Sequence, residues 1–252
     1  MLSSGQISYV SRTGDDHDLW MMKPDGSDVK PLTADSHHES DVAATPDGRY
    51  LVFASNRAGP NHLFRMDADG SNLQQLTFGE NSDSTPDCSP DGWVVYASWS
   101  GDKSTIWKVP IEGGTPIQLT DYHSVESSFS PDGKVISCIL PRSSKVERGS
   151  IAIVPAAGGP PIKTFDVVQF AYYYVTPRWS LDGQSVVYTR IQNSAGNLWK
   201  QHIAGGEPQQ LTDFKTDYIS NFAFSRDGKK IVLARGPKGA YAVLIKHFKR
   251  SA

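Results

Sequence analysis

The sequence contains little that would crosslink, anchor or export the chain. Its two cysteines, Cys88 and Cys138, do not make a disulfide framework. No run approaches the roughly 18 uninterrupted apolar residues of a transmembrane helix. Residues 1–5 show neither the basic start nor the apolar core of an export signal. We therefore expect no membrane insertion and no export signal in this sequence, which leaves its compartment unknown.

Charge of one sign is not in excess either. The formal net charge is −2, whereas a nucleic-acid-binding protein would call for a clustered basic face. We expect no nucleic-acid partner. The 252 residues are 38% hydrophobic and 21% charged, which is typical of a folded globular protein.

A short phrase ending in Asp-Gly recurs along the chain, with 41 to 50 residues between successive glycines. The copies are Thr45-Pro46-Asp47-Gly48, Ser89-Pro90-Asp91-Gly92, Ser130-Pro131-Asp132-Gly133, Ser180-Leu181-Asp182-Gly183 and Ser225-Arg226-Asp227-Gly228, and Gly5 matches the end of a sixth. A period of this length is typical of a β-propeller blade of four short strands.

Each repeat has the pattern of four antiparallel strands. An apolar residue three positions before the shared Asp, such as Trp179, marks the first strand. A run rich in β-branched and aromatic residues follows the turn and marks the second. The third strand carries a pair such as Leu198-Trp199, and the fourth ends in Leu-Thr. The second strands are expected at 7–10, 50–54, 93–97, 135–139, 185–189 and 230–234.

These repeats predict an all-β fold, a six-bladed β-propeller of four-stranded antiparallel blades whose first and last blades are incomplete. We expect one domain over residues 1–252. A lone blade cannot bury both faces. The aromatic side chains of the first and third strands are therefore expected to pack between neighbouring blades. The first unit lacks an innermost strand and the last lacks an outermost one. This predicts a weak seam between residues 7–10 and 241–248 and favours a piece of a longer chain. The units are expected at about 1–33, 34–77, 78–120, 121–165, 166–212 and 213–252.

The phrase over residues 177–183 and the Leu-Trp to Leu-Thr half over 198–212 resemble the WD-repeat-like propeller family to which the TolB β-propeller belongs. Residues 205–214, 222–230 and 242–245 are similar to the C-terminal sensor propeller of bacterial Ser/Thr kinases and winged-helix regulators. This resemblance implies a bacterial sensing or docking domain, usually placed outside the cytoplasm. The kinase loops, the winged helix and the membrane span of those proteins are absent from the sequence.

Motifs for catalysis are sparse. The Gly-x-Ser-x-Gly elbow of serine hydrolases and the phosphate-binding loop do not occur. The densest cluster of metal-ligand types is His37-His38-Glu39-Ser40-Asp41, which would suit zinc or manganese but is typical of a solvated connection between strands. We expect no catalytic residue, cofactor or metal.

A set of polar residues emerges when the repeats are compared. Six positions before the shared Asp stand Asp41, Thr85, Glu126, Thr176 and Asn221. Because these positions lie on the innermost strand, we expect them to line the mouth of the central channel, with further polar residues in the loops above. The candidate partner-binding residues are Glu39, Asp41, Asp83, His123, Glu126, Tyr174, Asp217 and Asn221.

Three functions compete at this point. The first is a non-catalytic interaction or sensing module, monomeric, that binds a protein or peptide partner at the channel mouth. The second is a metal-dependent lyase or hydrolase with its site in the channel. The third is a structural fragment of a larger signalling protein. A purely structural alternative for the polar set is that these side chains hydrate a water-filled channel and cap turns.

Overall fold

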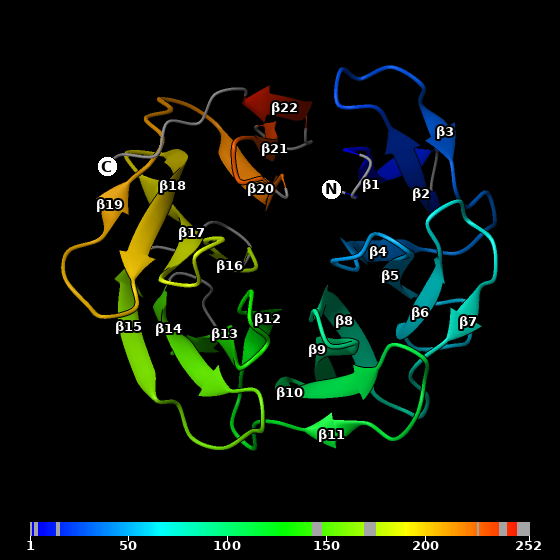
Figure 1. Cartoon of the computed structure of the whole chain (residues 1–252), viewed down its shortest axis with the longest axis horizontal. Coiled ribbons are helices and arrows are strands. Elements are labelled where there is room, and N and C mark those ends of the chain that lie inside the picture. The colour runs from blue at the N-terminus through cyan, green and yellow to red at the C-terminus, as the bar shows by residue number, and fades with distance from the viewer. Residues whose placement is uncertain are drawn as a thin grey trace.

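The computed structural model describes residues 2, 5–13, 16–142, 148–168, 175–225, 227–236 and 241–245. In these ranges all regular structure is β-strand, which confirms the all-β class. None of the described segments is a helix that could cross a membrane. The strands form antiparallel sheets arranged like spokes around a central axis (Figure 1).

The first half of the described chain contains three sheets. They are β1 (Ile7–Thr13), β2 (Asp16–Met22) and β3 (Lys30–Pro31); β4 (Glu39–Ala44), β5 (Tyr50–Ser55), β6 (His62–Asp67) and β7 (Gln74–Gln75); and β8 (Ser82–Cys88), β9 (Trp93–Ser100), β10 (Lys103–Pro110) and β11 (Ile117–Gln118).

The second half contains three more. They are β12 (Val125–Phe129), β13 (Val135–Pro141), β14 (Arg148–Pro155) and β15 (Lys163–Val168); β16 (Arg178–Trp179), β17 (Ser185–Gln192), β18 (Ala195–His202) and β19 (Gln209–Gln210); and β20 (Tyr218–Phe224), β21 (Ile231–Gly236) and β22 (Tyr241–Ile245).

The prediction of a six-bladed propeller is wrong. Within the described ranges, only five sheets have the innermost strand of a blade, namely β4, β8, β12, β16 and β20. Among the residues that the structure describes, the sheet β1–β2–β3 has no such strand, and the sheet β20–β21–β22 has no fourth strand. The physical reason is that each blade takes its innermost strand from the residues before its Asp-Gly turn, and the described residues supply no such strand ahead of Gly5.

The recurring phrase closes the turn between the first and second strands of a blade. In one copy the Ser130 hydroxyl donates to Asp132 Oδ1 at 2.6 Å, and the N–H of Lys134 donates to the same oxygen at 3.2 Å. Gly133 has a φ of 70°, which a side chain would strain. The Ser, the Asp and the Gly of the phrase are thus each required by the turn.

Apolar side chains join neighbouring sheets. Phe129 and Cys138 pack with Val95 and Ile106 in a cluster between the sheets of β8–β11 and β12–β15. Trp179 packs in the cluster between the sheets of β12–β15 and β16–β19. Both cysteines are buried free thiols: Cys138 lies in the first of these clusters, and Cys88 lies in the cluster between the sheets of β4–β7 and β8–β11. The rings of the first and third strands therefore act as core between blades, as the repeat predicted.

Candidate functional site

Three innermost strands carry a β-bulge at the same position of the repeat. The pairing register shifts between Ser40 and Ala43, between Ser84 and Asp87, and between Val125 and Ser128. Inside these bulges lie Asp41, Thr85 and Glu126, with φ values of 55°, 51° and 54°. A residue other than glycine in this left-handed region costs roughly 1–2 kcal/mol. Three residues at equivalent places of neighbouring innermost strands therefore have a strained backbone.

The side chains in the bulges hold neighbouring blades together around the axis. Asp41 Oδ2 accepts the N–H of Thr85 at 3.2 Å. Glu126 Oε2 accepts the hydroxyl of Thr176 at 2.5 Å. The Thr85 hydroxyl is buried and has no hydrogen-bond partner within the described part of the chain. The structure thus brings four of the five residues of the polar set into contact between adjacent repeats, and it leaves a polar group there unused.

An ion pair that the sequence reasoning missed crosses the same region. Arg178 Nη1 lies 2.9 Å from Asp87 Oδ1, although one sheet, β12–β15, separates their blades. Asp87 Oδ2 also accepts the N–H of Phe129 at 2.9 Å. The sequence does contain an indication of this ion pair. Four positions before the shared Asp, two repeats have the charged residues Asp87 and Arg178, whereas the other repeats have Ala or Ser.

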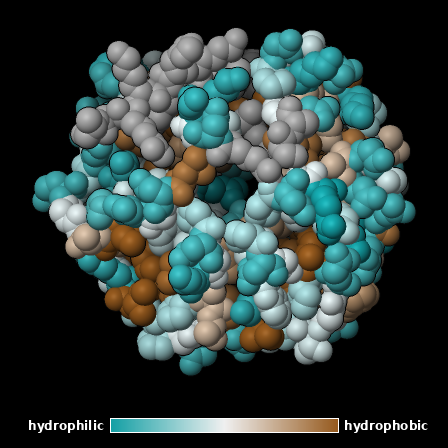
Figure 2. Space-filling model, in the orientation of Figure 1, coloured by the Kyte–Doolittle hydropathy of each residue, from teal (hydrophilic) through white to brown (hydrophobic). Residues whose placement is uncertain are grey.

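Burial shapes the electrostatics of this region. It raises the pKa of Glu126 to about 8, and the nearby Asp41 carboxylate adds to the rise. Burial also raises the pKa of Asp41 and of Asp87, and the Arg178 guanidinium opposes both rises. The carboxyl groups of Asp41, Asp87 and Glu126 therefore have a single nearby guanidinium, that of Arg178. This excess of carboxyl groups favours protonation of one of them or binding of a further cation. Figure 2 shows the central hollow as hydrophilic.

Two of the predicted loop residues lie inside the protein. Glu39 is fully buried, and its Oε1 accepts from Arg57 Nη2 at 2.8 Å and from the Ser55 hydroxyl at 2.9 Å. Asp83 is 3% exposed, lies 3.5 Å from His62 Nδ1, and has a pKa raised by burial. Both carboxyl groups belong to networks between strands rather than to an open surface.

The other predicted residues are scattered. His123 Nδ1 lies 3.2 Å from the backbone nitrogen of Ser104. Asp217 pairs with Arg235 at 3.5 Å. Asn221 is exposed, and its side-chain oxygen accepts the N–H of the next residue. Tyr174 lies outside the described residues. The contacts of the three described residues, His123, Asp217 and Asn221, do not join them to one another.

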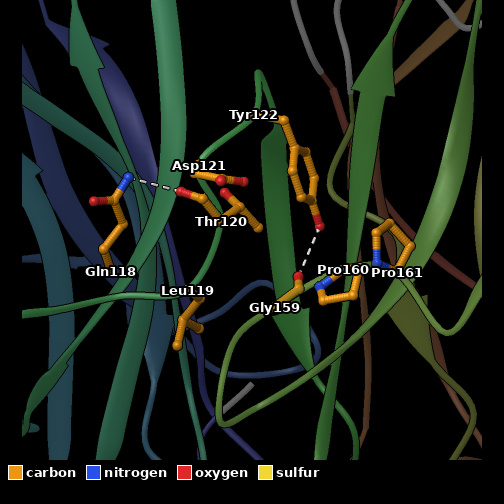
Figure 3. A pocket seen from close by; sticks show the side chains of 8 residues that line it. All are labelled: Gln118, Leu119, Thr120, Asp121, Tyr122, Gly159, Pro160 and Pro161. Atoms are coloured by element: carbon orange, nitrogen blue, oxygen red, sulfur yellow. Dashed lines mark hydrogen bonds between the residues drawn. The ribbon is translucent and has the colours of Figure 1, made fainter.

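A separate depression of about 500 Å³ lies at the outer edge, between the third and fourth sheets (Figure 3). Tyr122 donates its hydroxyl to the carbonyl of Gly159 at 3.2 Å across it, and Pro160 and Pro161 form its rim. It contains one charged side chain, Asp121. No catalytic arrangement is built there.

Within the described ranges, no cluster of three or more His, Cys, Asp or Glu side chains is placed to hold a metal ion. The His17 and His38 rings meet edge to face with centroids 5.2 Å apart, bringing one histidine of the predicted cluster to the neighbouring sheet.

Comparison with known proteins identifies the family. Residues 4–160 match the model of the TolB beta propeller domain. The chain belongs to this family. Among solved structures, TolB from Acinetobacter baumannii superposes with a TM-score of 0.75 at 19% identity, over 96% of this chain and 61% of that one. An oligogalacturonate lyase in complex with manganese superposes with a TM-score of 0.63 at 13% identity, over 96% of this chain and 71% of that one. These likenesses show the shared fold.

One curated relative is similar in sequence. It is an "Uncharacterized peptidase YuxL" of Bacillus subtilis (strain 168), 26% identical over 144 residues. The match covers 56% of this chain and only 20% of that protein. The peptidase and lyase names leave an enzymatic function open for this chain. The similarity to the sensor propellers of Ser/Thr kinases and winged-helix regulators remains a prediction.

Proposed function

We propose that this TolB-type propeller is a non-catalytic interaction or sensing module that binds a protein or peptide partner at the channel mouth. The observation that carries the proposal is the repeated bulge, which holds Asp41, Thr85 and Glu126 in the left-handed conformation at equivalent places. Strain of this kind persists where the surrounding structure enforces it, and it is common at ligand sites. Because the same strained bulge occurs in three neighbouring strands, we infer that the three bulges serve one binding function together.

The chemistry of the mouth favours a basic or polar segment. Asp41, Asp87 and Glu126 provide three carboxyl groups, and Arg178 provides the guanidinium that they share. A lysine or arginine side chain entering the channel would find acceptors already positioned, together with the free Thr85 hydroxyl. Rigid blades hold these groups in place, so binding would cost little reorganisation.

The residues of the loops and of the outer strands enter the proposal differently. Glu39 and Asp83 would support the mouth from within, because their carboxyl groups are buried in contacts with Arg57 and His62. His123, Asp217 and Asn221, with Tyr174, remain proposed contacts for a partner larger than one side chain.

A charge-matched peptide panel tests the proposal. Fluorescent Gly-Ser peptides that carry either three lysines or three glutamates are titrated against the protein and against the double variant Asp41→Asn, Glu126→Gln. We expect saturable binding of the lysine peptide only, weakened at least about tenfold in the double variant. The control variant Asp102→Asn, Glu207→Gln makes the same two substitutions at exposed sites. Equal binding by the two double variants would refute the mouth as the site.

The enzymatic alternative is tested separately. Metal analysis of the purified protein, followed by an assay with polygalacturonate and with peptide substrates, asks whether the chain turns over either class. Bound stoichiometric metal together with turnover abolished by Asp41→Asn would replace the interaction module by a channel enzyme.

A further inference from the structure

One arginine lies among the three buried carboxyl groups of the bulge region. Arg178 Nη1 lies 2.9 Å from Asp87 Oδ1. Burial raises the pKa of Asp41, of Asp87 and of Glu126, and the Arg178 guanidinium opposes the rise at each of them. Its charge therefore acts on the same three carboxyl groups that the proposed function assigns to a partner's cation.

The fold does not require a long side chain at this position of the repeat. Four positions before the shared Asp, the other repeats have Ala43, Asp87, Ser128 and Ala223. Ala43 is buried in an apolar cluster, and Ser128 is 2% exposed. Small side chains thus satisfy the packing there, so we expect the charge of Arg178 to have a role other than packing.

Each carboxyl group of the bulge region uses one oxygen to bind the repeat that follows it. Asp41 Oδ2 accepts the N–H of Thr85, and Asp87 Oδ2 accepts the N–H of Phe129. Glu126 Oε2 likewise accepts a hydroxyl from the following repeat. The second oxygen of each group is the one that a cation would bind.

Only one of these second oxygens has a protein donor in the described part of the chain. Asp87 Oδ1 accepts from Arg178 Nη1. No described group donates to Asp41 Oδ1 or to Glu126 Oε1. Arg178 therefore already occupies an oxygen of the kind that a partner's ammonium or guanidinium group would bind.

Arg178 is held by fewer contacts than a structural arginine of the same molecule. The Arg57 guanidinium pairs with Glu39 and with Asp35, its Nε donates to a serine hydroxyl at 3.0 Å, and its side chain is 13% exposed. Arg178 has one ion pair, its buried Nε has no partner in the described ranges, and its side chain is 22% exposed. Displacing Arg178 from Asp87 would therefore break a single ion pair rather than a network.

We propose that Arg178 is an internal competitor of the partner's cation. It holds the carboxyl group of Asp87 in the free protein, and a partner's lysine or arginine side chain binds to the bulge region by displacing it. The inference rests on the proposed function and names the group that limits the affinity of that site. A second cation brought beside the guanidinium is repelled by it, and the repulsion is strong where water is scarce.

Removal of the guanidinium tests the inference. The lysine peptide of the proposed function is titrated against the wild type, Arg178→Met and Arg49→Met. Methionine keeps an apolar stem in place of the arginine stem, and we expect Arg178→Met to bind the peptide at least about fivefold more tightly than the wild type. Arg49→Met is the matched control, because Arg49 pairs with Asp47 at an exposed turn and its removal changes the net charge equally. Its affinity should stay within about twofold of the wild type.

Chemical rescue provides a second measurement. Methylguanidinium at millimolar concentration should occupy the space vacated in Arg178→Ala. It should raise the melting temperature of that variant and return its affinity for the lysine peptide toward the wild-type value. Sodium chloride at the same ionic strength is the control, since it screens charge without replacing the guanidinium, and it should leave the melting temperature of the variant unchanged.

A background without the Asp87 carboxylate guards against loss of folding. Asp87→Asn with Arg178→Met leaves no unpaired charge from the pair, and it should bind the lysine peptide at least about fivefold more tightly than Asp87→Asn alone. Equal or weaker binding after the removal of Arg178 in either background would contradict the inference while leaving the proposed function in place. Absence of lysine-peptide binding by every one of these proteins would overturn both.

Discussion

Arg178 and Asp87 form an ion pair across the channel, 2.9 Å apart, from blades that are not neighbours in the ring. Their side chains are about one-fifth exposed. The pair thus ties the β16 blade to the β8 blade next to the strained bulges. It joins the electrostatics of the bulge region to the stability of the ring.

Removing one partner of this pair should destabilise the fold. In Arg178→Ala the Asp87 carboxylate loses its counter-charge while still held away from water. We expect the free energy of unfolding to fall by about 2–4 kcal/mol. Urea denaturation measures it. The double variant Asp87→Asn, Arg178→Ala should recover part of the loss, and a cost equal to the sum of the two single variants would show that the residues do not interact.

The Glu126 carboxyl group should make stability depend on pH. Its folded pKa is about 8, above the ordinary value of 4.5, so the folded state binds a proton that the unfolded state has released. That contribution is complete below about pH 4.5 and is lost as the pH rises through 8. Between these values the free energy of unfolding should fall by at most roughly 1.4 kcal/mol per pH unit.

Glu126→Gln should remove this part of the slope, since the amide stays neutral at every pH. Denaturation curves of the two proteins at pH 5, 7 and 9 provide the comparison. Parallel pH profiles would mean that Glu126 titrates as an exposed carboxyl group does.

The Glu39 carboxylate should contribute to stability rather than to partner capture. Glu39→Ala removes a fully buried acceptor from the Ser55 hydroxyl and from Arg57, which keeps only its weaker ion pair with Asp35 at 3.3 Å. We expect a loss of about 2–4 kcal/mol in urea denaturation. Binding of the lysine peptide by the folded fraction should stay within about twofold of the wild type. A variant that keeps its stability but loses peptide binding would show instead that Glu39 contributes to partner binding.

A close approach between blades makes Gly196 sensitive to substitution. A Cβ there would lie 2.9 Å from the backbone nitrogen of Ile219 and 3.2 Å from the Tyr218 Cα. Gly196→Ala should therefore cost about 1–3 kcal/mol. Gly101→Ala is the comparison: its Cβ meets nothing within 4 Å, so only its φ of 59° opposes the change, at about 1 kcal/mol. Thermal unfolding ranks the two, and an equal cost would contradict the close contact.

The repeat in the sequence predicts much of this structure. The Asp-Gly phrase, the β-rich runs and the Leu-Trp pairs identify the strands because each has a local cause in turn geometry or packing. Comparing repeats also singled out Asp41, Thr85 and Glu126, since a polar residue recurs at one strand position. The repeats identified the incomplete terminal units correctly but overcounted the blades, because the first unit was counted as a blade although no innermost strand is described for it.

Contacts between distant repeats were not visible in the same way. The Asp87–Arg178 pair joins two blades across the axis, which no comparison of neighbouring positions shows. Glu39 and Asp83 look like surface carboxylates in sequence, yet Arg57 and His62 from other strands allow them to be buried. The left-handed bulge could not be predicted either, because a glycine would indicate a positive φ in the sequence, whereas Asp, Thr and Glu do not.

The central claim is that the channel mouth is where a partner binds, and a hydrogen-exchange footprint of the lysine peptide tests it most directly. The account predicts slowed exchange in residues 40–42, 84–86 and 125–127, with no change in the outer strands β3, β7 and β11. Protection confined to the outer strands, with the bulges unchanged, would contradict it.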